Sequence, residues 1–343
     1  MNSEAIPTLQ VAVVGATGLV GTMMLQVLEE RGFPVRRLLP VASDRSVGEG
    51  ASVRFRGELL PVMTIADALA AQPDVALFSA GGSVSLEWAP KFAAAGTTVI
   101  DNSSAWRMHP SHKLVVPEVN GHVLTGTDLL IANPNCTTAQ LVMALKPIHD
   151  RWGIEGGVVN TYQSVTGSGH AGIQQLRAER EGAYAENPAY PHPIDRNVIP
   201  HCDIFDSMNG FTREEMKVWY ETRKILQDEQ IAMRCTAVRV PVEGGHSEAV
   251  YLELRQTPAD MTEVRAALAA FPGVRVVDDP ADAGYPMPLM AHGRDEVFVG
   301  RLRRDLAKPN ALHLWIVADN LRKGAATNAV QIAEHLLTSG RWS

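Results

Sequence analysis

The first part of the chain alternates short apolar runs with segments whose apolar residues recur at helical spacing. One helical pattern fills Val20 to Arg31 and another fills Leu86 to Ala95. Strands that alternate with helices form parallel sheets covered on both faces, so this part predicts a doubly wound, Rossmann-like α/β domain. The apolar runs that predict its strands are residues 11–15, 35–42, 74–82, 97–104 and 129–135.

After about residue 155 the pattern changes to runs rich in β-branched residues with few helices between them, which predicts a mixed or antiparallel sheet. Residues 185–205 are rich in proline and predict an extended excursion rather than a linker. The tail, residues 324–340, has helical spacing and could pack back on the first domain. The runs that predict the second sheet are residues 156–165, 233–242, 247–256 and 311–319.

These patterns predict two domains, as the length of 343 residues also does. We expect an N-terminal α/β domain of residues 1–135, completed by residues 324–343, and an α+β domain with a mixed sheet at residues 136–323.

The composition narrows the class of protein. The net charge of -7 argues against a nucleic-acid partner, because binding phosphates needs clustered Lys and Arg. The three cysteines are widely spaced without a CxxC pair, which fits a reducing compartment. No segment reaches the roughly 18 consecutive apolar residues of a membrane helix. We therefore expect a cytoplasmic protein with no membrane partner.

Gly15, Gly18 and Gly21 lie between the first predicted strand and the first predicted helix. Glycines there let the backbone turn tightly and approach a pyrophosphate, whose charge the helix N-terminus favours. The spacing is GxxGxxG rather than GxGxxG, and a tight turn without a ligand is the alternative. The position at the start of an alternating domain favours dinucleotide binding.

The turn after the second predicted strand decides between the two nicotinamide cofactors. Ser43, Arg45 and Ser46 cluster there, and an arginine flanked by hydroxyls can hold a ribose 2′-phosphate. Asp44 lies in the same turn, and an acidic residue favours NAD instead. We expect NADP; the alternative is an exposed polar loop.

Cys136 lies at the predicted start of a helix, directly after a predicted strand. A helix N-terminus stabilises a thiolate, and its N–H groups can hold an oxyanion on an attacked carbonyl, to which Asn135 could add a side-chain donor. The alternative is an inert buried thiol. A nucleophilic cysteine needs a base, and His246, which follows two glycines and precedes a predicted strand, is the candidate.

A thiol beside a nicotinamide indicates one class of reaction, in which the thiolate adds to an aldehyde, a hydride leaves and a thioester remains. The segment "NCTTA" resembles the active-site cysteine segment of phosphorylating aldehyde dehydrogenases. Along nearly its whole length the chain resembles the aspartate-β-semialdehyde dehydrogenase family. The segments that carry the resemblance, in the order of the family, are "VGATGLVG", "FSAGGSVS", "DNSSAWRM", "VVPEVN", "NPNCTT", "TYQSVTGSG", "HPIDRNVIPH", "EEMKVWYETRKIL", "RVPVEGGHSEAV" and "ADNLRKGAATNAVQIAE".

The resemblance implies reduction of β-aspartyl phosphate to aspartate-β-semialdehyde with NADPH and release of inorganic phosphate, in the biosynthesis of lysine, threonine, methionine and isoleucine. It implies no metal. It also implies a catalytic and dimerisation domain whose sheet face makes a homodimer, with a tetramer as the alternative.

The resemblance also implies roles for individual residues. Cys136 matches the nucleophile, His246 the general acid/base and Gln163 the residue that positions the reacting groups. The residues matched to substrate binding are Arg239 for the α-carboxylate, Glu214 for the α-amino group, and Arg107 and Lys217 for the phosphate, with Asn135 beside them. The positions matched to the cofactor are Gly15, Ala16, Thr17, Gly18, Leu19, Val20, Gly21, Ser43, Arg45, Ser46, Ser79, Ala80, Gly81, Gly82, Ser164, Gly167 and Asn320.

Glu214 and Lys217 lie three apart on a predicted helix and so share a face, and from the spacing alone a surface ion pair is the preferred interpretation. One position departs from the family, which often has glycine-lysine where this chain has Glu49 in the ribose-phosphate loop. That departure weakens the expectation of NADP over NAD.

Three rivals remain. N-acetyl-γ-glutamyl-phosphate reductase performs the same chemistry on an acetylated substrate, which has no charge to pair with Glu214. A catalytically silent relative would bind dinucleotide but lack the nucleophile. A cysteine hydrolase would use Cys136 and His246 and leave the glycine loop without a role.

Overall fold

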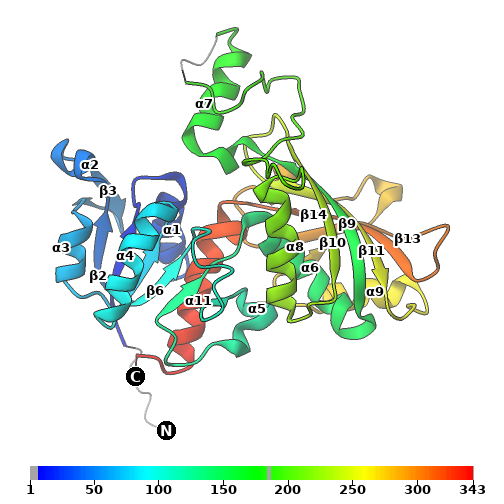
Figure 1. Cartoon of the computed structure of the whole chain (residues 1–343), viewed down its shortest axis with the longest axis horizontal. Coiled ribbons are helices and arrows are strands. Elements are labelled where there is room, and N and C mark those ends of the chain that lie inside the picture. Colours follow the sequence, from blue (N-terminus) through cyan, green and yellow to red (C-terminus); the bar gives the residue numbers. More distant parts are fainter. Residues whose placement is uncertain (1–6, 184–186, 343) are drawn as a thin grey trace. The chain divides into compact units, whose positions relative to one another are not determined.

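The computed structural model describes residues 7–183 and 187–342, and the chain divides into two compact units. One unit comprises the residues up to Pro134 together with those from Ala325 onward, and the other is Asn135–Gly324 (Figure 1). Each unit has its own sheet.

The first unit contains a parallel six-stranded sheet with the strand order β2-β1-β5-β6-β8-β7. A small antiparallel hairpin, β3–β4, is attached to it in sequence. The elements of this unit are β1 (Leu9–Val14), α1 (Leu19–Glu30), β2 (Val35–Val41), α2 (Asp44–Gly48), β3 (Ser52–Phe55), β4 (Glu58–Pro61), α3 (Ile65–Ala70), β5 (Val75–Phe78), α4 (Gly82–Ala94), β6 (Thr98–Asp101), β7 (Lys113–Leu114), α5 (Pro117–Asn120), the 3-10 turn η1 (Gly121–Val123), β8 (Leu130–Ala132) and α11 (Thr327–Thr338).

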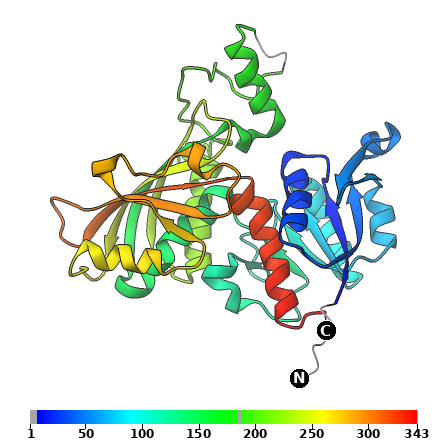
Figure 2. The ribbon, with the colours of Figure 1, turned by 180° about the vertical axis from the view of Figure 1, so that it is seen from behind.

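Helices cover both faces of this parallel sheet. Val11 and Val13 of β1 face a core that contains residues of α1 and α11, the red helix of Figure 2. Ala12 and Val14 face the opposite core, which contains residues of α3 and α4. Successive side chains of a strand point to opposite faces, so a strand buried on both faces is apolar throughout. The predicted doubly wound fold is confirmed.

The second unit contains a mixed six-stranded sheet with the strand order β10-β9-β11-β14-β13-β12. The β10–β9 and β12–β13 pairs are parallel and the other three pairs are antiparallel. The elements of this unit are α6 (Cys136–Trp152), β9 (Ile154–Gln163), η2 (Val165–Ser168), α7 (Gly169–Arg180), α8 (Arg213–Leu226), β10 (Ala232–Arg239), β11 (His246–Leu254), α9 (Met261–Ala269), β12 (Val274–Val276), η3 (Pro280–Asp282), α10 (Pro288–Ala291), β13 (Val297–Arg304), β14 (Ala311–Ala318) and the π-helical turn η4 (Arg322–Ala326).

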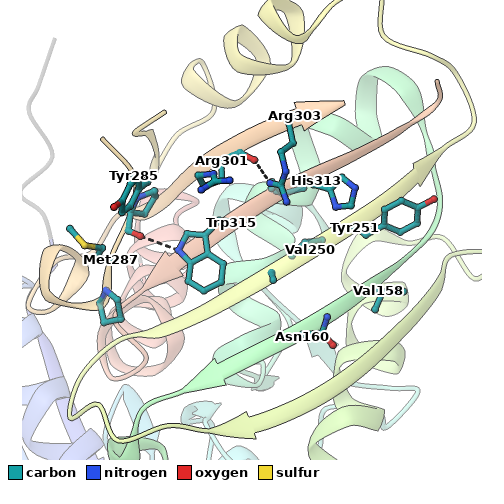
Figure 3. A pocket seen from close by; sticks show the side chains of 14 residues that line it. Val158, Asn160, Val250, Tyr251, Tyr285, Met287, Arg301, Arg303, His313 and Trp315 are labelled. Carbon is teal, nitrogen blue, oxygen red and sulfur yellow. Dashed lines mark hydrogen bonds between the residues drawn. The ribbon is translucent and has the colours of Figure 1, made fainter. Parts of the chain in front are cut away.

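The two faces of the mixed sheet differ. Helices α6, α8 and α9 pack against its strands, and along β9 the residues Val159, Thr161 and Gln163 are buried. The alternate residues Val158 and Tyr162 are more than one-third exposed. Figure 3 shows the exposed face, where side chains of β9, β11, β13 and β14 line a hollow of about 500 Å³.

Every strand predicted from the apolar runs is present, although the ends move. The run at 74–82 is a strand only to Phe78, and α4 begins at Gly82 rather than at Leu86. The reason is Gly81, whose positive φ of 88° turns the chain directly into the helix. β13 was not predicted, because its C-terminal part is basic; in the structure Arg301 and Arg303 are exposed and alternate with the buried Leu302.

The proline-rich segment contains no helix or strand between residues 187 and 205. Tyr190, Ile194 and Ile199 nevertheless lie in a small apolar core with Val165 and Leu176. The predicted start of the excursion, residues 185 and 186, lies outside the described residues. In the described part of the chain, no helix combines the length and apolarity needed to cross a bilayer.

Candidate active site

Cys136 is the first residue of helix α6, as predicted, and its side chain is partly exposed. Asn135 caps the helix, because its Oδ1 accepts hydrogen bonds from the main-chain N–H groups of Thr137 and Thr138 at 3.1 and 3.4 Å. Gly324 packs against the cysteine so closely that a Cβ added there would lie 2.9 Å from the Cys136 Cβ. The thiol therefore lies at a capped helix N-terminus with the backbone of η4 against it.

A buried carboxylate holds the segment before Cys136. The Nδ2 of Asn135 donates to Oε1 of Glu214 at 3.0 Å, and Gln163 Nε2 donates to the same oxygen at 3.1 Å. The main-chain N–H of Asn135 donates to Glu221 Oε2 at 2.7 Å. The side-chain amide of Asn135 thus caps α6 through its oxygen and binds Glu214 of α8 through its nitrogen. Its nitrogen therefore already donates to a carboxylate, whereas the sequence predicts it to be a donor to an oxyanion beside the cysteine.

Glu214 and Lys217 form an ion pair on one face of α8, with Nζ 3.0 Å from Oε2. Lys217 also lies 2.7 Å from Asp203 Oδ2. A capping box between Thr212 and Glu215 sets the first turn of α8 and so the direction of this face. The predicted shared face is confirmed, and because Glu214 is 7% exposed the pair is not a simple surface ion pair.

The charges of this pair follow from its surroundings. Burial alone would raise the pKa of Glu214, but Lys217 and the hydrogen bonds from Asn135, Lys217 and Gln163 lower it to about 2. Burial acts to lower the pKa of Lys217, yet Glu214 and Asp203 outweigh it and raise that pKa. At neutral pH the site therefore contains a carboxylate and an ammonium group.

Three strand ends bring the remaining polar residues to one edge of the second sheet. Gln163 ends β9 and pairs in register with Arg239, the last residue of the parallel strand β10. His246 begins the antiparallel strand β11, which pairs with β9 on its other side (Figure 1). Residues far apart in the sequence are therefore neighbours at this edge.

His246 is fully buried and is oriented by the turn that follows β9. Its Nδ1 lies 3.1 Å from the main-chain N–H of Ser164, which donates to it, so Nδ1 is the unprotonated nitrogen. Arg239 Nη1 donates to the carbonyl of the same serine at 2.7 Å. A Cβ added at Gly167 would lie 2.7 Å from Arg239 Nη1 and 3.2 Å from His246 Nε2, so only glycine fits beside the two side chains.

The imidazole is neutral at physiological pH. Burial and, second, the positive charge of Arg239 lower the pKa of His246 to about 3. Among the described residues, His246 Nε2 and Arg239 Nε have no hydrogen-bond partner although both atoms are buried. Buried polar atoms are normally paired, so these two are available to a ligand.

Asn320, Ser164 and Gly167, which were predicted to contact the cofactor, lie around the same histidine. Asn320 Oδ1 accepts hydrogen bonds from Ser164 Oγ and Thr166 Oγ1 at 3.0 and 3.1 Å. It also accepts one from the N–H of Gly245 at 3.3 Å. Asn320 therefore holds together the turn after β9 and the turn before β11.

The glycine loop of the first unit has the shape that a pyrophosphate requires. Gly15 has a φ of 90°, and a Cβ added there would lie 2.5 Å from the carbonyl oxygen of Ser79. A Cβ added at Gly21 would lie 2.0 Å from the oxygen of Gly15. Gly18 caps α1 without a side-chain hydrogen bond to the helix.

The glycine loop also lies where α/β sheets usually bind ligands. The strand order changes direction between β1 and β5, and the loop follows β1 at that point. The residues thus fit a dinucleotide, with Ala16, Thr17, Leu19 and Val20 in the loop.

Two other predicted cofactor segments also follow strands of this sheet. Ser43 caps the short helix α2 by accepting from the N–H of Ser46, and the two hydroxyls lie 3.0 Å apart. Arg45, the residue predicted to bind the 2′-phosphate, is exposed, and its Nε lies 2.9 Å from Oε1 of Glu49. Glu49 is the position that departs from the family, and it forms an ion pair with Arg45. The segment from Ser79 through Ala80, Gly81 and Gly82 connects β5 to α4.

Arg107 is buried in the first unit, whereas Lys217 belongs to the second. Its Nε donates to the carbonyl of Asn133 and its Nη2 to that of Asn102, both at 2.9 Å. The structure therefore gives Arg107 a role in fixing the chain after β6 and β8.

Sequence reasoning missed three residues of the site. Glu221 holds Asn135, Asp203 holds Lys217, and Gln140 Nε2 donates to the carbonyl of His246 at 3.3 Å. Glu221 follows Glu214 by two helical turns, and Gln140 follows Cys136 by one. Helical spacing could therefore have predicted that each residue lies on the same face of its helix as the site residue before it. Asp203 lies in the irregular proline-rich segment and had no such signal. No three His, Cys, Asp or Glu side chains of the described residues are grouped as metal ligands would be.

Comparison with known proteins gives a consistent result. A family model described as "Semialdehyde dehydrogenase, NAD binding domain" matches residues 10–127, and one described as "Semialdehyde dehydrogenase, dimerisation domain" matches residues 145–323. An aspartate-semialdehyde dehydrogenase of Aquifex aeolicus is 51% identical over 96% of this chain and 98% of its own. One from Legionella pneumophila is 52% identical over 96% and 95%. The crystal structure of aspartate semialdehyde dehydrogenase II from Vibrio cholerae, complexed with ASA, has a TM-score of 0.92 and 45% identity, covering 97% of this chain and 99% of that one.

The depressed pKa of His246 predicts a pH-dependent stability. Between about pH 6.5 and 3 the unfolded chain carries a proton on this imidazole that the folded chain does not, so stability is lost as the pH falls. We expect the free energy of unfolding to fall by about 2 kcal/mol more between pH 7 and pH 5 in the wild type than in His246→Asn. Urea unfolding at both pH values measures this. His170→Asn, which changes an exposed imidazole, is the control and should behave like the wild type. Equal pH dependence of His246→Asn and the wild type would show that the imidazole titrates normally in the folded chain.

Proposed function

The chain belongs to the aspartate-semialdehyde dehydrogenase family, and from this premise we propose that it is an NADP-dependent, phosphorylating enzyme of that kind. In the biosynthetic direction it would reduce β-aspartyl phosphate to aspartate-β-semialdehyde and release inorganic phosphate. We propose that it acts in the cytoplasm, in the synthesis of lysine, threonine, methionine and isoleucine.

One observation carries the proposal. Within a single unit, a partly exposed cysteine begins helix α6, and a neutral histidine, whose Nε2 has no partner among the described residues, begins strand β11. The hydrogen bonds of Asn135, Glu214 and Gln163 connect the start of α6 to the end of β9, which pairs with β11. A thiol, a base and a fixed charge pattern are what thioester chemistry on an amino acid requires.

Opposite charges would bind the two α-substituents of the substrate. Arg239 has a buried guanidinium with an unpartnered Nε, and a guanidinium fork suits a carboxylate. Glu214 stays ionised and would pair with the α-ammonium group. Lys217 and Arg107 would bind the phosphate; for Lys217 this requires a phosphate oxygen to compete with Asp203.

The reaction begins when the thiolate of Cys136 attacks the acyl phosphate. The new C–S bond replaces the C–O bond to phosphate, which leaves as inorganic phosphate, and a thioester remains on the cysteine. The positive end of the α6 dipole would favour the oxyanion that forms during attack, whereas the N–H groups of Thr137 and Thr138 are held by Asn135. Gln163, which is fixed by Glu214, would orient the acyl group.

The thioester carbonyl is then reduced by a hydride that NADPH supplies. His246 would act through its Nε2: because Nδ1 accepts from the N–H of Ser164, the neutral imidazole carries its hydrogen on Nε2 and would donate it in a hydrogen bond to the oxyanion of the adduct. In the reverse direction the same N–H would stabilise the oxyanion until the hydride leaves. Collapse of the adduct releases the aldehyde and returns the thiolate.

The first unit would hold the cofactor. Gly15, Gly18 and Gly21 would admit the pyrophosphate, and Arg45 with Ser43 would hold the 2′-phosphate. The pairing of Arg45 with Glu49 opposes this role, so the preference for NADP over NAD should be limited.

The rivals fit less well. An acetylated substrate offers no cation to the buried Glu214, whose charge is already maintained by Lys217. A silent relative would have no need of Cys136 and the neutral His246. A cysteine hydrolase would leave the glycine cradle of the first unit unused.

We also propose that the exposed face of the mixed sheet makes a homodimer. The matched family model of this unit is described as a dimerisation domain. The face is hollowed and partly apolar, and Figure 3 shows Val158, Tyr251 and Trp315 pointing from β9, β11 and β14 to the same side. Exposed apolar faces of this kind mark protein interfaces. A tetramer would need a second surface.

Removal of the nucleophile tests the chemistry. Cys136→Ala should lower the rate of NADPH formation from aspartate-β-semialdehyde, NADP and phosphate by roughly 10³-fold or more, because no other group can form the thioester. NADPH binding measured by calorimetry should be unchanged. Cys235→Ala is the matched control, since burial raises the pKa of that thiol and keeps it inert. Substantial activity of Cys136→Ala, or equal turnover of the N-acetyl-γ-glutamyl substrate, would refute the assignment.

The ribose-phosphate loop makes a second prediction. Arg45→Ala should raise the KM for NADPH by about tenfold, the loss of one charge-assisted hydrogen bond, and leave the KM for NADH unchanged. Glu49→Gln should lower the KM for NADPH, because it frees the guanidinium of Arg45. Steady-state kinetics with both cofactors measure the effects. No response of either variant would mean that another residue binds the 2′-phosphate.

The dimer proposal predicts a change of mass. Val158→Asp should shift the protein from about twice the 37.2 kDa of one chain to a single chain in sedimentation equilibrium, because the carboxylate would be buried against the partner. Leu86→Asp, at an exposed residue of α4 in the first unit, should leave the mass unchanged. A dimer that survives Val158→Asp would exclude this face as the interface.

A further inference from the structure

Glu248 is a carboxyl group in the interior of the second unit that the proposed reaction does not use. It lies on β11 two residues after His246, on the same face of the strand, and is fully buried. Its neighbours across the sheet are Thr161 of β9 and Ile316 of β14. Among the described residues, neither carboxyl oxygen has a hydrogen-bond partner.

Gln140 is the polar side chain that faces it. Gln140 lies one helical turn after Cys136 on α6, so the two residues share a face of that helix. Its Nε2 donates to the carbonyl of His246 at 3.3 Å, and its Oε1 has no donor among the described residues. The Gln140 amide lowers the pKa of the Glu248 carboxyl, although no hydrogen bond between the two side chains forms in the structure. Among the described residues, three buried acceptor oxygens of these two side chains thus have no donor.

A proton supplies the missing donor. Burial raises the pKa of Glu248 well above its usual range, and the nearby amide of Gln140 only partly opposes this. The titratable groups on the same buried face of the neighbouring strands are the neutral His246 of β11 and Cys235 and Arg239 of β10, and Glu215 of α8 faces the same strand β10. The cation among them, Arg239, donates to the carbonyl of Ser164 and not to Glu248.

We propose that Glu248 is a positioning residue in its protonated form, whose O–H donates to the side-chain amide of Gln140 while that amide holds the main chain of His246. The contact ties α6 to β11 one turn behind Cys136 and two residues behind His246. It therefore fixes the separation of the nucleophile and the base. The effect on the reaction rests on the proposed function, whereas the protonation of Glu248 does not.

The first test measures protonation without any activity. Above pH 4.5 an unfolded Glu248 ionises while the folded one stays neutral, so its contribution to stability is present below pH 4.5 and is lost as the pH rises. The ratio of the unfolding equilibrium constants of the wild type and Glu248→Gln should rise as the pH is raised above 4.5, by about tenfold per pH unit for as long as the folded carboxyl stays protonated. Urea unfolding of both proteins measures it. A ratio that does not change with pH would show an ionised Glu248 and overturn the proposal.

The second test measures positioning. Glu248→Leu removes the donor and should lower kcat by roughly 10- to 100-fold with KM unchanged, because a small displacement of reacting groups is costly. Glu248→Gln can still donate to Gln140 and should restore most of kcat with the pH profile of the wild type. Glu253→Leu, which removes a partly exposed carboxyl from the opposite face of the same strand, is the control and should leave kcat unchanged.

Two results of the second test would contradict the proposal: full activity of Glu248→Leu, or loss of activity in Glu248→Gln equal to that in Glu248→Leu. If Glu248→Leu does not fold, Glu248→Gln with its pH profile still decides. A wild type without activity would refute the proposed function instead, and the unfolding experiment would continue to test Glu248 separately.

Discussion

The carboxylate of Glu214 is the group on which the arrangement of the candidate site depends. It accepts hydrogen bonds from Asn135 before α6, from Gln163 at the end of β9 and from Lys217 on its own helix. A buried charge is tolerated only when its acceptor positions are filled, so these three donors must stay in place. The same charge would select a substrate with a free ammonium group. Structural and substrate requirements therefore coincide in one side chain.

Burial controls the protonation of the groups along β11. His246 and Glu248 share one face of the strand, and burial lowers the pKa of the first and raises that of the second because the interior penalises charge. Glu214, with its lysine and two amides, keeps its charge at similar depth. A neutral histidine whose Nδ1 accepts from Ser164 offers its Nε2 hydrogen to a ligand, and a neutral carboxyl is able to donate a hydrogen bond. In the account proposed here the interior thus selects the chemistry of each group.

The sequence predicted local features well and spatial neighbours poorly. Apolar periodicity predicted the doubly wound sheet, and a strand followed by a capped helix predicted the position of Cys136, because both depend on nearby residues. Periodicity could not predict that His246 and Gln163 lie close together, since their proximity depends on the pairing of β9 with β11. It also could not find Asp203, which lies in irregular chain, or the strand β13, whose exposed arginines concealed its alternation. The roles of individual residues came from resemblance to a family, not from pattern.

The central claim is that the thioester on Cys136 is exchanged with phosphate, and one measurement addresses it directly. NADPH formation by the wild-type protein from aspartate-β-semialdehyde and NADP should be followed with and without inorganic phosphate. The account predicts turnover that requires phosphate and saturates with it. Equal turnover without phosphate would mean that water releases the acyl group, and the phosphorylating mechanism would then be wrong.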